Sequence, residues 1–225
     1  MQRLARKAFI GLGCLFLAMA ALLFGPSWTF DYWQAWAFLA VYFASSLALT
    51  IYLIRNDPDL LERRMRGGPL AERQPAQRVI MLFASAGFLG LLLLPAFDRR
   101  FGWSQMSPSV ALAGDALVAL GWLAIFLVFR ENTFTSATIE LAAEQRVVST
   151  GPYALVRHPM YAGSLVMLLG VPIALGSWWG LIALGVIAPA LAWRMVDEER
   201  FLARHLAGYD AYKEKVRYRL IPHLW

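Results

Sequence analysis

The residues best suited to chemistry lie in one short segment, residues 151–163, which reads Gly-Pro-Tyr-Ala-Leu-Val-Arg-His-Pro-Met-Tyr-Ala-Gly. The Gly-Pro pair that opens it is typical of a turn, and Pro159 disfavours a helical conformation at His158 while suiting the first position of a helix. The pattern therefore predicts a helix that begins at Pro159, with His158 at its N-cap. Free backbone N–H groups and the positive end of the helix dipole then favour an anionic group beside Arg157 and His158.

A second candidate group is a run of three carboxylates, Asp197-Glu198-Glu199. Arg194 and Glu198 are four residues apart, so they can meet on one face of a helix. Taken alone, this pattern also fits a solvated helix end with an ion pair worth about 0–1 kcal/mol. However, the break at Gly176-Ser177 folds the helix that carries these residues back against the one that starts at Pro159. We therefore expect His158 and Glu198 to be neighbours.

Such a pair of groups suits a zwitterionic cofactor that has both a carboxylate and an ammonium group. Arg157 or the helix N-terminus would bind the carboxylate, and Glu198 or Glu199 would bind the ammonium. The sequence offers no comparable case for a metal, because its single cysteine, Cys14, and its three histidines show no ligand spacing.

Composition shows where these groups must operate. The chain has 225 residues, of which 59% are hydrophobic and only 16% charged, with a mean hydropathy of +0.52. That is too apolar for an ordinary soluble domain, so we expect an integral membrane protein. The net charge of +6 does not indicate nucleic-acid binding, because the basic residues follow membrane topology.

The apolar runs predict an all-α, polytopic transmembrane bundle with about five or six spans. They cover approximately residues 8–24, 32–54, 79–97, 110–129, 161–175 and 178–193. We interpret the first run as a transmembrane helix rather than a signal peptide, because more spans follow at once. The last two are short for a full crossing and are expected to form a helical hairpin. One membrane domain covers residues 1–225, with N-terminal helices in 1–130 and the cofactor-binding region in 131–225.

Basic residues predict the orientation. The polar segment between Arg55 and Arg78, in which we expect a short surface helix around residues 59–65, holds six arginines: Arg55, Arg63, Arg64, Arg66, Arg73 and Arg78. With the N-terminus in the cytoplasm, only Arg99 and Arg100 fall outside, as the positive-inside rule requires. Both termini and the cofactor site are then cytoplasmic, and the expected location is the inner (cytoplasmic) membrane.

At these residues the sequence resembles a known family. Arg157-His158-Pro159-Met160-Tyr161-Ala162-Gly163 followed by Glu198-Glu199 is similar to the signature of the isoprenylcysteine carboxyl methyltransferases and the related phospholipid N-methyltransferases. Further similar segments are Asn132-Thr133-Phe134, Val148 to Tyr153, and Tyr209-Asp210-Ala211-Tyr212. The resemblance covers about the C-terminal hundred residues.

This resemblance implies a membrane methyltransferase that uses S-adenosyl-L-methionine without a Rossmann domain. The residues that it places in the cofactor site are Tyr153, Arg157, His158, Pro159, Tyr161, Gly163, Glu198 and Glu199. Arg194 and Glu198 would be the catalytic residues, with Arg194 near the transferred methyl and the acceptor. Other roles stay open, because Tyr153 and Tyr161 also suit an interfacial belt, Gly163 also suits close helix packing, and Arg194 also suits contact with lipid phosphate.

The expected reaction is methylation of a lipophilic acceptor at the membrane interface, most simply the carboxylate of an isoprenylcysteine-like or other small lipophilic molecule. A carboxylate needs no general base, whereas an amine or a thiol must first lose a proton. Arg194 would orient a carboxylate through a bidentate contact. The expected partners are this lipophilic or lipidated substrate and membrane lipids, with neither nucleic acid nor metal.

Alternative readings remain open. The acceptor can instead be a phospholipid amine or a thiol. Residues 216–222 are similar to the end of membrane sterol reductases, which use NADPH, although the Glu198-Glu199 pair favours the methyltransferase. A scaffold or small transporter is the third reading. A transporter should carry ionisable groups near mid-membrane, where these spans hold almost none.

Overall fold

The computed structural model describes residues 2–67, 72, 75–139 and 145–225, and in these ranges it contains helices and no strand. Five helical stretches are long and apolar enough to cross a membrane: α1 (Gln2–Ser27), α2 (Trp33–Asn56), α4 (Pro75–Phe101), α5 (Pro108–Glu131), and Trp179–His205, which joins η2 (Trp179–Ala183) to α7 (Leu184–His205). The apolar helix α6 (Pro159–Ala174) is shorter. The predicted all-α polytopic bundle is therefore confirmed.

Proline marks where several of these helices begin. Pro58, Pro75, Pro108 and Pro159 are the first residues of α3 (Pro58–Met65), α4, α5 and α6. Proline suits this position because its fixed φ is helical and its missing N–H would have no partner there. The short helix α3 is capped by Asp57, whose Oδ1 accepts the N–H of Leu60 at 2.9 Å. This confirms the surface helix expected near residues 59–65, although Arg73 lies outside the described residues.

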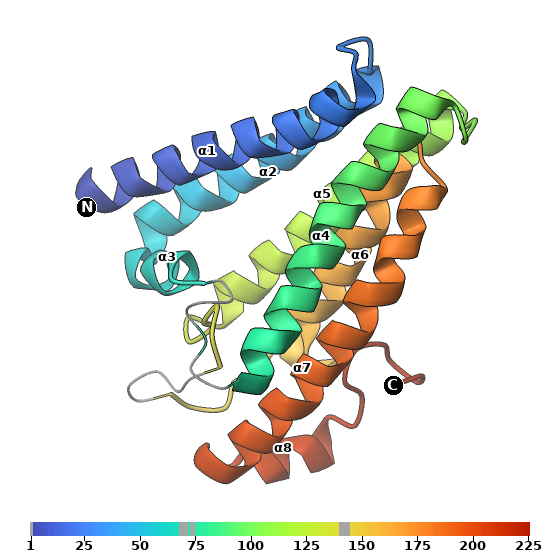
Figure 1. Ribbon diagram of the computed structural model, residues 1–225. Helices are drawn as coiled ribbons and strands as arrows, with labels where there is room; N and C mark the ends of the chain where they lie inside the picture. Colours follow the sequence, from blue (N-terminus) through green and yellow to red (C-terminus); the bar gives the residue numbers. More distant parts are fainter. Residues whose placement is uncertain (1, 68–71, 73–74, 140–144) are drawn as a thin grey trace.

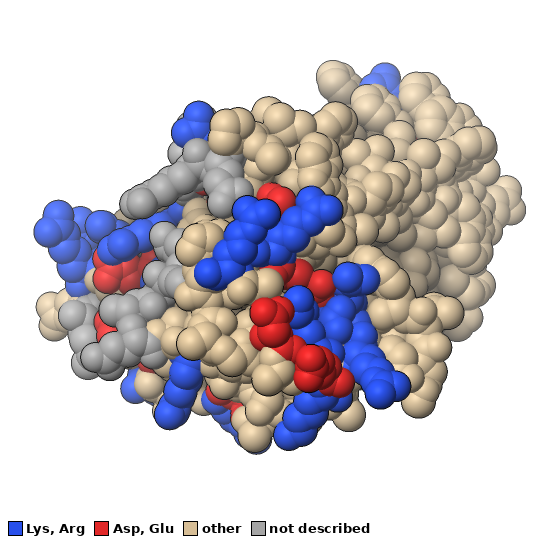
Figure 2. All heavy atoms as spheres, turned by 90° about the horizontal axis from the view of Figure 1, so that it is seen from below, with Lys and Arg blue, Asp and Glu red and all other residues tan. Residues whose placement is uncertain are grey.

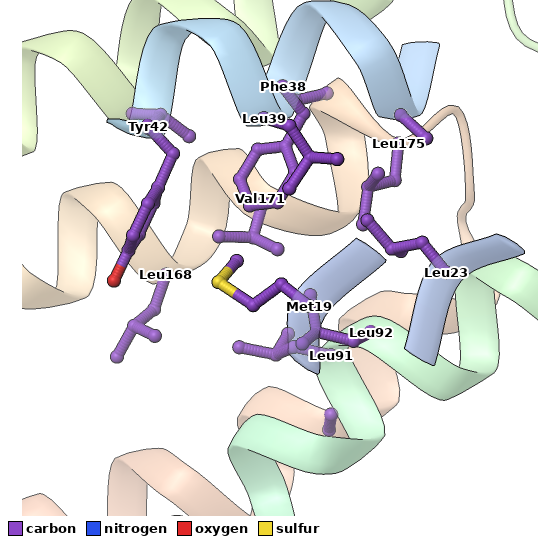
Figure 3. Packing of buried hydrophobic residues seen from close by; sticks show 14 of the residues in the cluster. Met19, Leu23, Phe38, Leu39, Tyr42, Leu91, Leu92, Leu168, Val171 and Leu175 are labelled. Carbon is purple, nitrogen blue, oxygen red and sulfur yellow. The ribbon is translucent and has the colours of Figure 1, made fainter. Parts of the chain in front are cut away.

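The bundle has a paired arrangement (Figure 1). Helices α1 and α2 run side by side, α4 lies against α7, and α5 lies against α6. Figure 3 shows Met19 of α1, Phe38 of α2, Leu91 of α4 and Val171 of α6 turned into one buried cluster. The N-terminal helices therefore share a core with the C-terminal ones, so the two regions predicted within one domain are packed together.

Glycines allow α5 and α6 to approach closely. A Cβ on Gly114 would lie 2.1 Å from the backbone nitrogen of Ala174, and one on Gly121 would lie 2.7 Å from the carbonyl oxygen of Gly163. Both neighbours are backbone atoms, which cannot rotate away as a side chain can. Because glycine has no Cβ, the two backbones can make this contact, as in other membrane helix pairs with small residues at the interface.

We expect Gly114→Ala to destabilise the protein by about 1–3 kcal/mol or more, because the added methyl forces α5 and α6 apart. Gly185→Ala is the matched control, since no atom lies within 4 Å of a Cβ placed on this α7 glycine. Thermal unfolding in detergent should show a lower midpoint for the first variant only. Equal midpoints for both variants would show that the two helices have room to separate.

The chain reverses between α6 and η2 around Gly176, whose φ is +75°. Its N–H donates to the carbonyl of Ile173 at 2.9 Å, and that of Ser177 donates to Pro172 at 2.9 Å, so carbonyls at the end of α6 are satisfied. The predicted hairpin is present as a reversal of the chain, but α6 packs mainly on α5 and α7 mainly on α4. The start of α6 and the end of α7 nevertheless lie at the same end of the bundle (Figure 1).

A buried carboxylate ties this reversal to α4. The span predicted at residues 79–97 stops one residue before Asp98, but α4 continues to Phe101 and Asp98 is buried in its last turn. Its carboxylate accepts hydrogen bonds from the N–H and Oγ of Ser104, both at 2.6 Å, and from the hydroxyl of Ser177. This cluster fixes the end of the bundle opposite the motif residues.

We call the other end, where α2, α5 and α7 end and α4 and α6 begin, the site end. Figure 2 views it from below, with lysine and arginine side chains spread across the face. The charge asymmetry follows the helix directions: the segment after α2, the start of α6 and the tail after α7 all lie here, while Arg99 and Arg100 lie at the other end. The site end therefore brings together every motif found in the sequence.

Candidate active site

The start of α6 has the predicted geometry. The 3₁₀ turn η1 (Gly151–Ala154) precedes it, Pro159 is its first residue and His158 is its N-cap. The His158 side chain does not cap the helix. The backbone N–H groups of Arg157 and His158 instead donate to the carbonyls of Tyr218 at 2.9 Å and Arg219 at 2.8 Å. We call residues 216–219 the tail strap, because they hold the chain just before α6 in place.

Glu199 is the centre of a buried charge cluster. Its Oε1 lies 2.7 Å from Nε of Arg157 and 3.2 Å from Nε2 of His158, and its Oε2 lies 3.0 Å from Nε of Arg219. Nη1 of Arg157 also donates to two tail-strap carbonyls, each at 2.9 Å. A buried carboxylate is tolerated when it is paired in this way. His158 therefore pairs with Glu199, whereas the sequence analysis expected Glu198.

A second polar cluster joins the three helices α4, α6 and α7 and Glu72, which precedes α4. The Tyr161 hydroxyl on α6 donates to Oε2 of Glu198 on α7 at 2.8 Å, and Nε of Arg194 donates to the same hydroxyl at 3.1 Å. Arg194 and Glu198 are thus linked through Tyr161. Nη1 of Arg194 donates to Oε1 of Gln77 on α4 at 3.1 Å. Its Nη2 lies 2.7 Å from a carboxylate oxygen of Glu72.

One cavity runs between these clusters and the segment that follows α5. Its motif-derived lining consists of Tyr153, Arg157, His158, Pro159, Tyr161, Arg194 and Glu198. The rest of the wall includes the segments around residues 132–139 and 145–148, Phe201, and the tail tyrosines Tyr209 and Tyr212. Cations, a carboxylate and aromatic rings therefore face a common space.

Aromatic residues form the side of the cavity near η1. The Tyr212 hydroxyl of α8 (Tyr209–Lys215) donates to the carbonyl of Tyr153 at 2.8 Å, which fixes the turn before α6. Burial raises the pKa of the Tyr153 phenol well above its usual range, and burial raises the pKa of Tyr212 to about 12. Both phenols therefore remain neutral at physiological pH, where a phenol can donate a hydrogen bond or stack but is not a base.

Two of the eight residues proposed for the cofactor site do not line this cavity. Gly163 faces α5, where a Cβ would lie 2.8 Å from that of Ala124, so the structure gives it the packing role that the sequence analysis left open. Glu199 lies behind the cavity and holds Arg157 and His158. Its position favours an indirect role, in which it orients the residues that face the ligand.

Sequence reasoning did not find the contributions of the N-terminal half. Gln77 is fully buried and Glu72 nearly so, and both contact Arg194. Arg64 of α3 donates to the carbonyl of Ser136, next to the Ala137 carbonyl that accepts from Arg194. The sequence does carry a signal for Gln77: it is a polar residue in the first turn of α4, on the same face as the buried Ile80.

The Asn132-Thr133-Phe134 motif has a positioning role in this geometry. Oδ1 of Asn132 accepts the N–H of Phe134 at 2.9 Å, and the Thr133 hydroxyl donates to the carboxylate of Asp57, the N-cap of α3. The motif therefore attaches α3 to the wall of the cavity. In the described ranges, no cluster of histidine, cysteine, aspartate or glutamate has the arrangement of a metal site.

Two comparisons with known proteins give matches to this chain. Residues 109–208 match the family model described as phospholipid methyltransferase. A curated protein, the cobalt-zinc-cadmium resistance protein CzcN of Cupriavidus metallidurans, is 27% identical over 145 residues, which are 61% of this chain and 58% of the relative. The chain thus spans less than two thirds of that relative's length. The matched region includes α6, α7 and most of the cavity wall, which confirms the resemblance drawn from the motifs and supports a membrane methyltransferase.

Proposed function

We propose that this membrane methyltransferase takes its methyl group from S-adenosyl-L-methionine and transfers it to the carboxylate of a lipophilic acceptor at the membrane interface. An isoprenylcysteine-like molecule, or another small lipophilic carboxylate, is the acceptor class that fits best. The observation that carries the proposal is the convergence of the α6 N-terminus, Glu198 and Arg194 on one cavity. These groups provide one site for the carboxylate of the donor, one for its ammonium group and one for the acceptor.

The side chains and backbone groups that face the cavity fit the cofactor. S-adenosyl-L-methionine carries a carboxylate, an ammonium group and an adenine ring, and it supplies an electrophilic methyl group. The N-terminus of α6, whose cap side chain is turned toward Glu199, suits the carboxylate. Glu198 suits the ammonium group, and Tyr153 and Phe201 offer aromatic surfaces to the adenine.

Arg194 is the proposed acceptor-orienting group. Its guanidinium already binds the carboxylate of Glu72 at 2.7 Å, so this position accommodates a carboxylate. An incoming acceptor would take the place of Glu72 or share the guanidinium with it. Since a carboxylate is nucleophilic without losing a proton, the protein needs only to align it and to exclude water.

Phospholipid N-methylation is the second candidate, and the description of the matched family favours it. An amine acceptor must lose a proton before or during transfer, which requires a base. Glu198 could act as this base, because its carboxylate lines the cavity and accepts the Tyr161 hydroxyl. Thiol S-methylation has the same requirement. Mass analysis of the methylated product separates the three acceptor types.

We further propose that the site end faces the cytoplasm, with both termini there and the protein in the cytoplasmic membrane. The concentration of arginine and lysine at this end supports it, because positively charged segments are retained on the cytoplasmic side. In this arrangement residues 131–225 hold the cofactor. Residues 1–130 contribute the acceptor side through Glu72 and Gln77.

Calorimetric titration of the purified protein with S-adenosylhomocysteine tests the cofactor assignment. We expect micromolar binding that Glu198→Gln weakens by about 10- to 100-fold, the usual cost of losing a charged hydrogen-bond partner. His158→Ala should also weaken it. The exposed Glu214→Gln in α8 is the control and should bind like the native protein. A folded sample that binds NADPH and not S-adenosylhomocysteine would move the reductase reading to first place.

A further inference from the structure

A cationic groove lies on the outer side of α7, separate from the methyl-transfer cavity. Its charged lining is Glu199, Arg200, Arg204, Lys213 and Arg219. None of its lining residues also lines the cavity. Its only carboxylate, Glu199, is already paired with Arg157 and Arg219. The groove therefore has an excess of positive charge that the methyl-transfer site does not use.

Arg200 and Arg204 supply the available charge. They are one turn apart on α7, both are exposed, and neither has an ion-pair partner among the residues that the structure describes. Arg219 uses its Nε on Glu199, and its two Nη groups have no hydrogen bond within the described chain. Lys213 closes the groove from α8 and is 2.8 Å from Asp210. Three guanidinium groups can thus receive one anion.

From its position on α7, we infer that the groove lies close to the membrane surface. Arg200 directly follows Glu199, which contacts His158 at the start of the membrane helix α6. It is about 10 Å along α7 from Trp193, using the helical rise. The indole of Trp193 is 48% exposed, as expected for an interfacial tryptophan. At that level the groove would meet the phosphate groups of lipids.

An apolar surface adjoins the cations. Residues 219–225 form a closed turn in which the main-chain oxygen of Trp225 accepts the N–H groups of Arg219, Leu220 and Ile221 at 2.9, 2.9 and 3.2 Å. The Trp225 ring lies 5.4 Å from the Arg219 guanidinium carbon. Ile221, Leu224 and Trp225 are all exposed. Free phosphate has no apolar part that could contact this surface, whereas a lipid can pack its glycerol and acyl region against it.

We propose that this groove binds one anionic phospholipid, with the headgroup phosphate on Arg200, Arg204 and Arg219 and the upper acyl chains against Ile221, Leu224 and Trp225. Charge complementarity and the adjoining apolar turn identify this occupant. Because Arg219 also holds Glu199 and belongs to the tail strap, the bound lipid stabilises the segment that positions Arg157 and His158.

Native mass spectrometry of the full chain in neutral detergent tests this proposal. The probes are phosphatidylglycerol, phosphatidylcholine with the same acyl chains, and inorganic phosphate. We expect phosphatidylglycerol to bind best and Arg200→Gln/Arg204→Gln to weaken it about 10- to 30-fold, the effect of two interfacial cations at about 1 kcal/mol each. Arg200→Lys/Arg204→Lys should retain most of the binding. Arg3→Gln/Arg6→Gln, which removes two exposed cations from α1, is the matched control.

The outcomes are distinct. Loss of phosphatidylglycerol binding in the α7 pair alone, with native affinity for S-adenosylhomocysteine, supports a separate lipid site. Equal loss in the α1 and α7 pairs would mean that net charge alone attracts the lipid, which overturns the proposal. It is also overturned if phosphatidylcholine binds as well as phosphatidylglycerol, or if inorganic phosphate binds as tightly as the lipid. None of these results depends on which acceptor is methylated.

Discussion

Glu199→Gln is expected to lower the free energy of unfolding by about 3–5 kcal/mol and to abolish cofactor binding under conditions where the native protein binds. Glu199 is 6% exposed and lies within ion-pair distance of Arg157, His158 and Arg219. Glutamine is nearly the same size but carries no charge, so the buried Arg157 guanidinium loses its counter-ion. Removing one partner from a buried pair costs more than the pair itself contributes.

The consequence extends beyond stability, because the same carboxylate links three segments. Arg157 reaches the tail strap through two carbonyls, and His158 precedes the first turn of α6. Without Glu199, the strap and the start of α6 lose their shared anchor. We therefore expect Tyr209 and Tyr212, which line the cavity from α8, to become more accessible to solvent.

Thermal unfolding in detergent and titration with S-adenosylhomocysteine measure the two effects. Glu62→Gln is the control, since Glu62 forms an exposed ion pair with Arg66 on α3 at 2.7 Å. Such a pair contributes less than about 1 kcal/mol. If Glu199→Gln melts with the Glu62→Gln protein and binds the ligand normally, Glu199 is not the anchor that the geometry indicates.

The spans were predictable because burial in lipid imposes a long apolar run on each helix. The sequence analysis placed spans at residues 32–54 and 110–129, and the helices run from Trp33 to Asn56 and from Pro108 to Glu131. The predicted ends of the spans were less accurate where a charged residue was the only sign that a helix stops. Asp98 appeared to end a span, but hydrogen bonds from Ser104 and Ser177 keep it inside the structure as part of α4.

Asp115 shows the same limit within a span. Both of its carboxylate oxygens are buried in α5 without a hydrogen-bond partner in the described ranges. The sequence analysis counted the span interiors as almost free of charge. Asp115 lies in the half of α5 that is farther from the site end. A single residue does not form the line of ionisable groups that a transport path needs, so it gives little support to a transporter.

The site was predictable to the level of the helix ends, but not of the individual carboxylates. The fold-back at Gly176 correctly predicted that the start of α6 meets the end of α7. Consecutive residues on a helix differ in direction by about 100°, so Glu198 and Glu199 cannot face the same partner. The spacing alone did not say which one meets His158, and the structure assigns that contact to Glu199.

The polar residue in the first turn of α4 marked Gln77 as unusual, but its partner in the C-terminal half could not have been predicted. Gln77 and Arg194 are separated by 117 positions, and no motif connects them. Their contact depends on α4 lying against α7, which is a property of the packed bundle. Most of the residues proposed to hold the cofactor lie in short local motifs, whereas those proposed for the acceptor side come together only through tertiary packing.

Arg194→Lys is expected to reduce kcat/KM for a carboxylate acceptor by about 100-fold or more, the usual cost of losing a preorganised donor. Its guanidinium serves Tyr161, Gln77, Ala137 and Glu72 at once through three nitrogens. Lysine keeps the charge but cannot hold these directions together or offer a bidentate contact. The alignment of the acceptor should therefore be lost while the cofactor residues remain in place.

The measurement is transfer of a labelled methyl group to N-acetyl-S-farnesylcysteine, with S-adenosylhomocysteine binding as the second readout. Arg130→Lys, at an exposed position at the end of α5, is the control and should transfer at the native rate. We expect Arg194→Lys to bind S-adenosylhomocysteine within about threefold of the native protein, because the role proposed for Arg194 is to orient the acceptor. A parallel loss of both binding and transfer would place Arg194 in the cofactor site. A native rate would show that the acceptor carboxylate does not use this arginine.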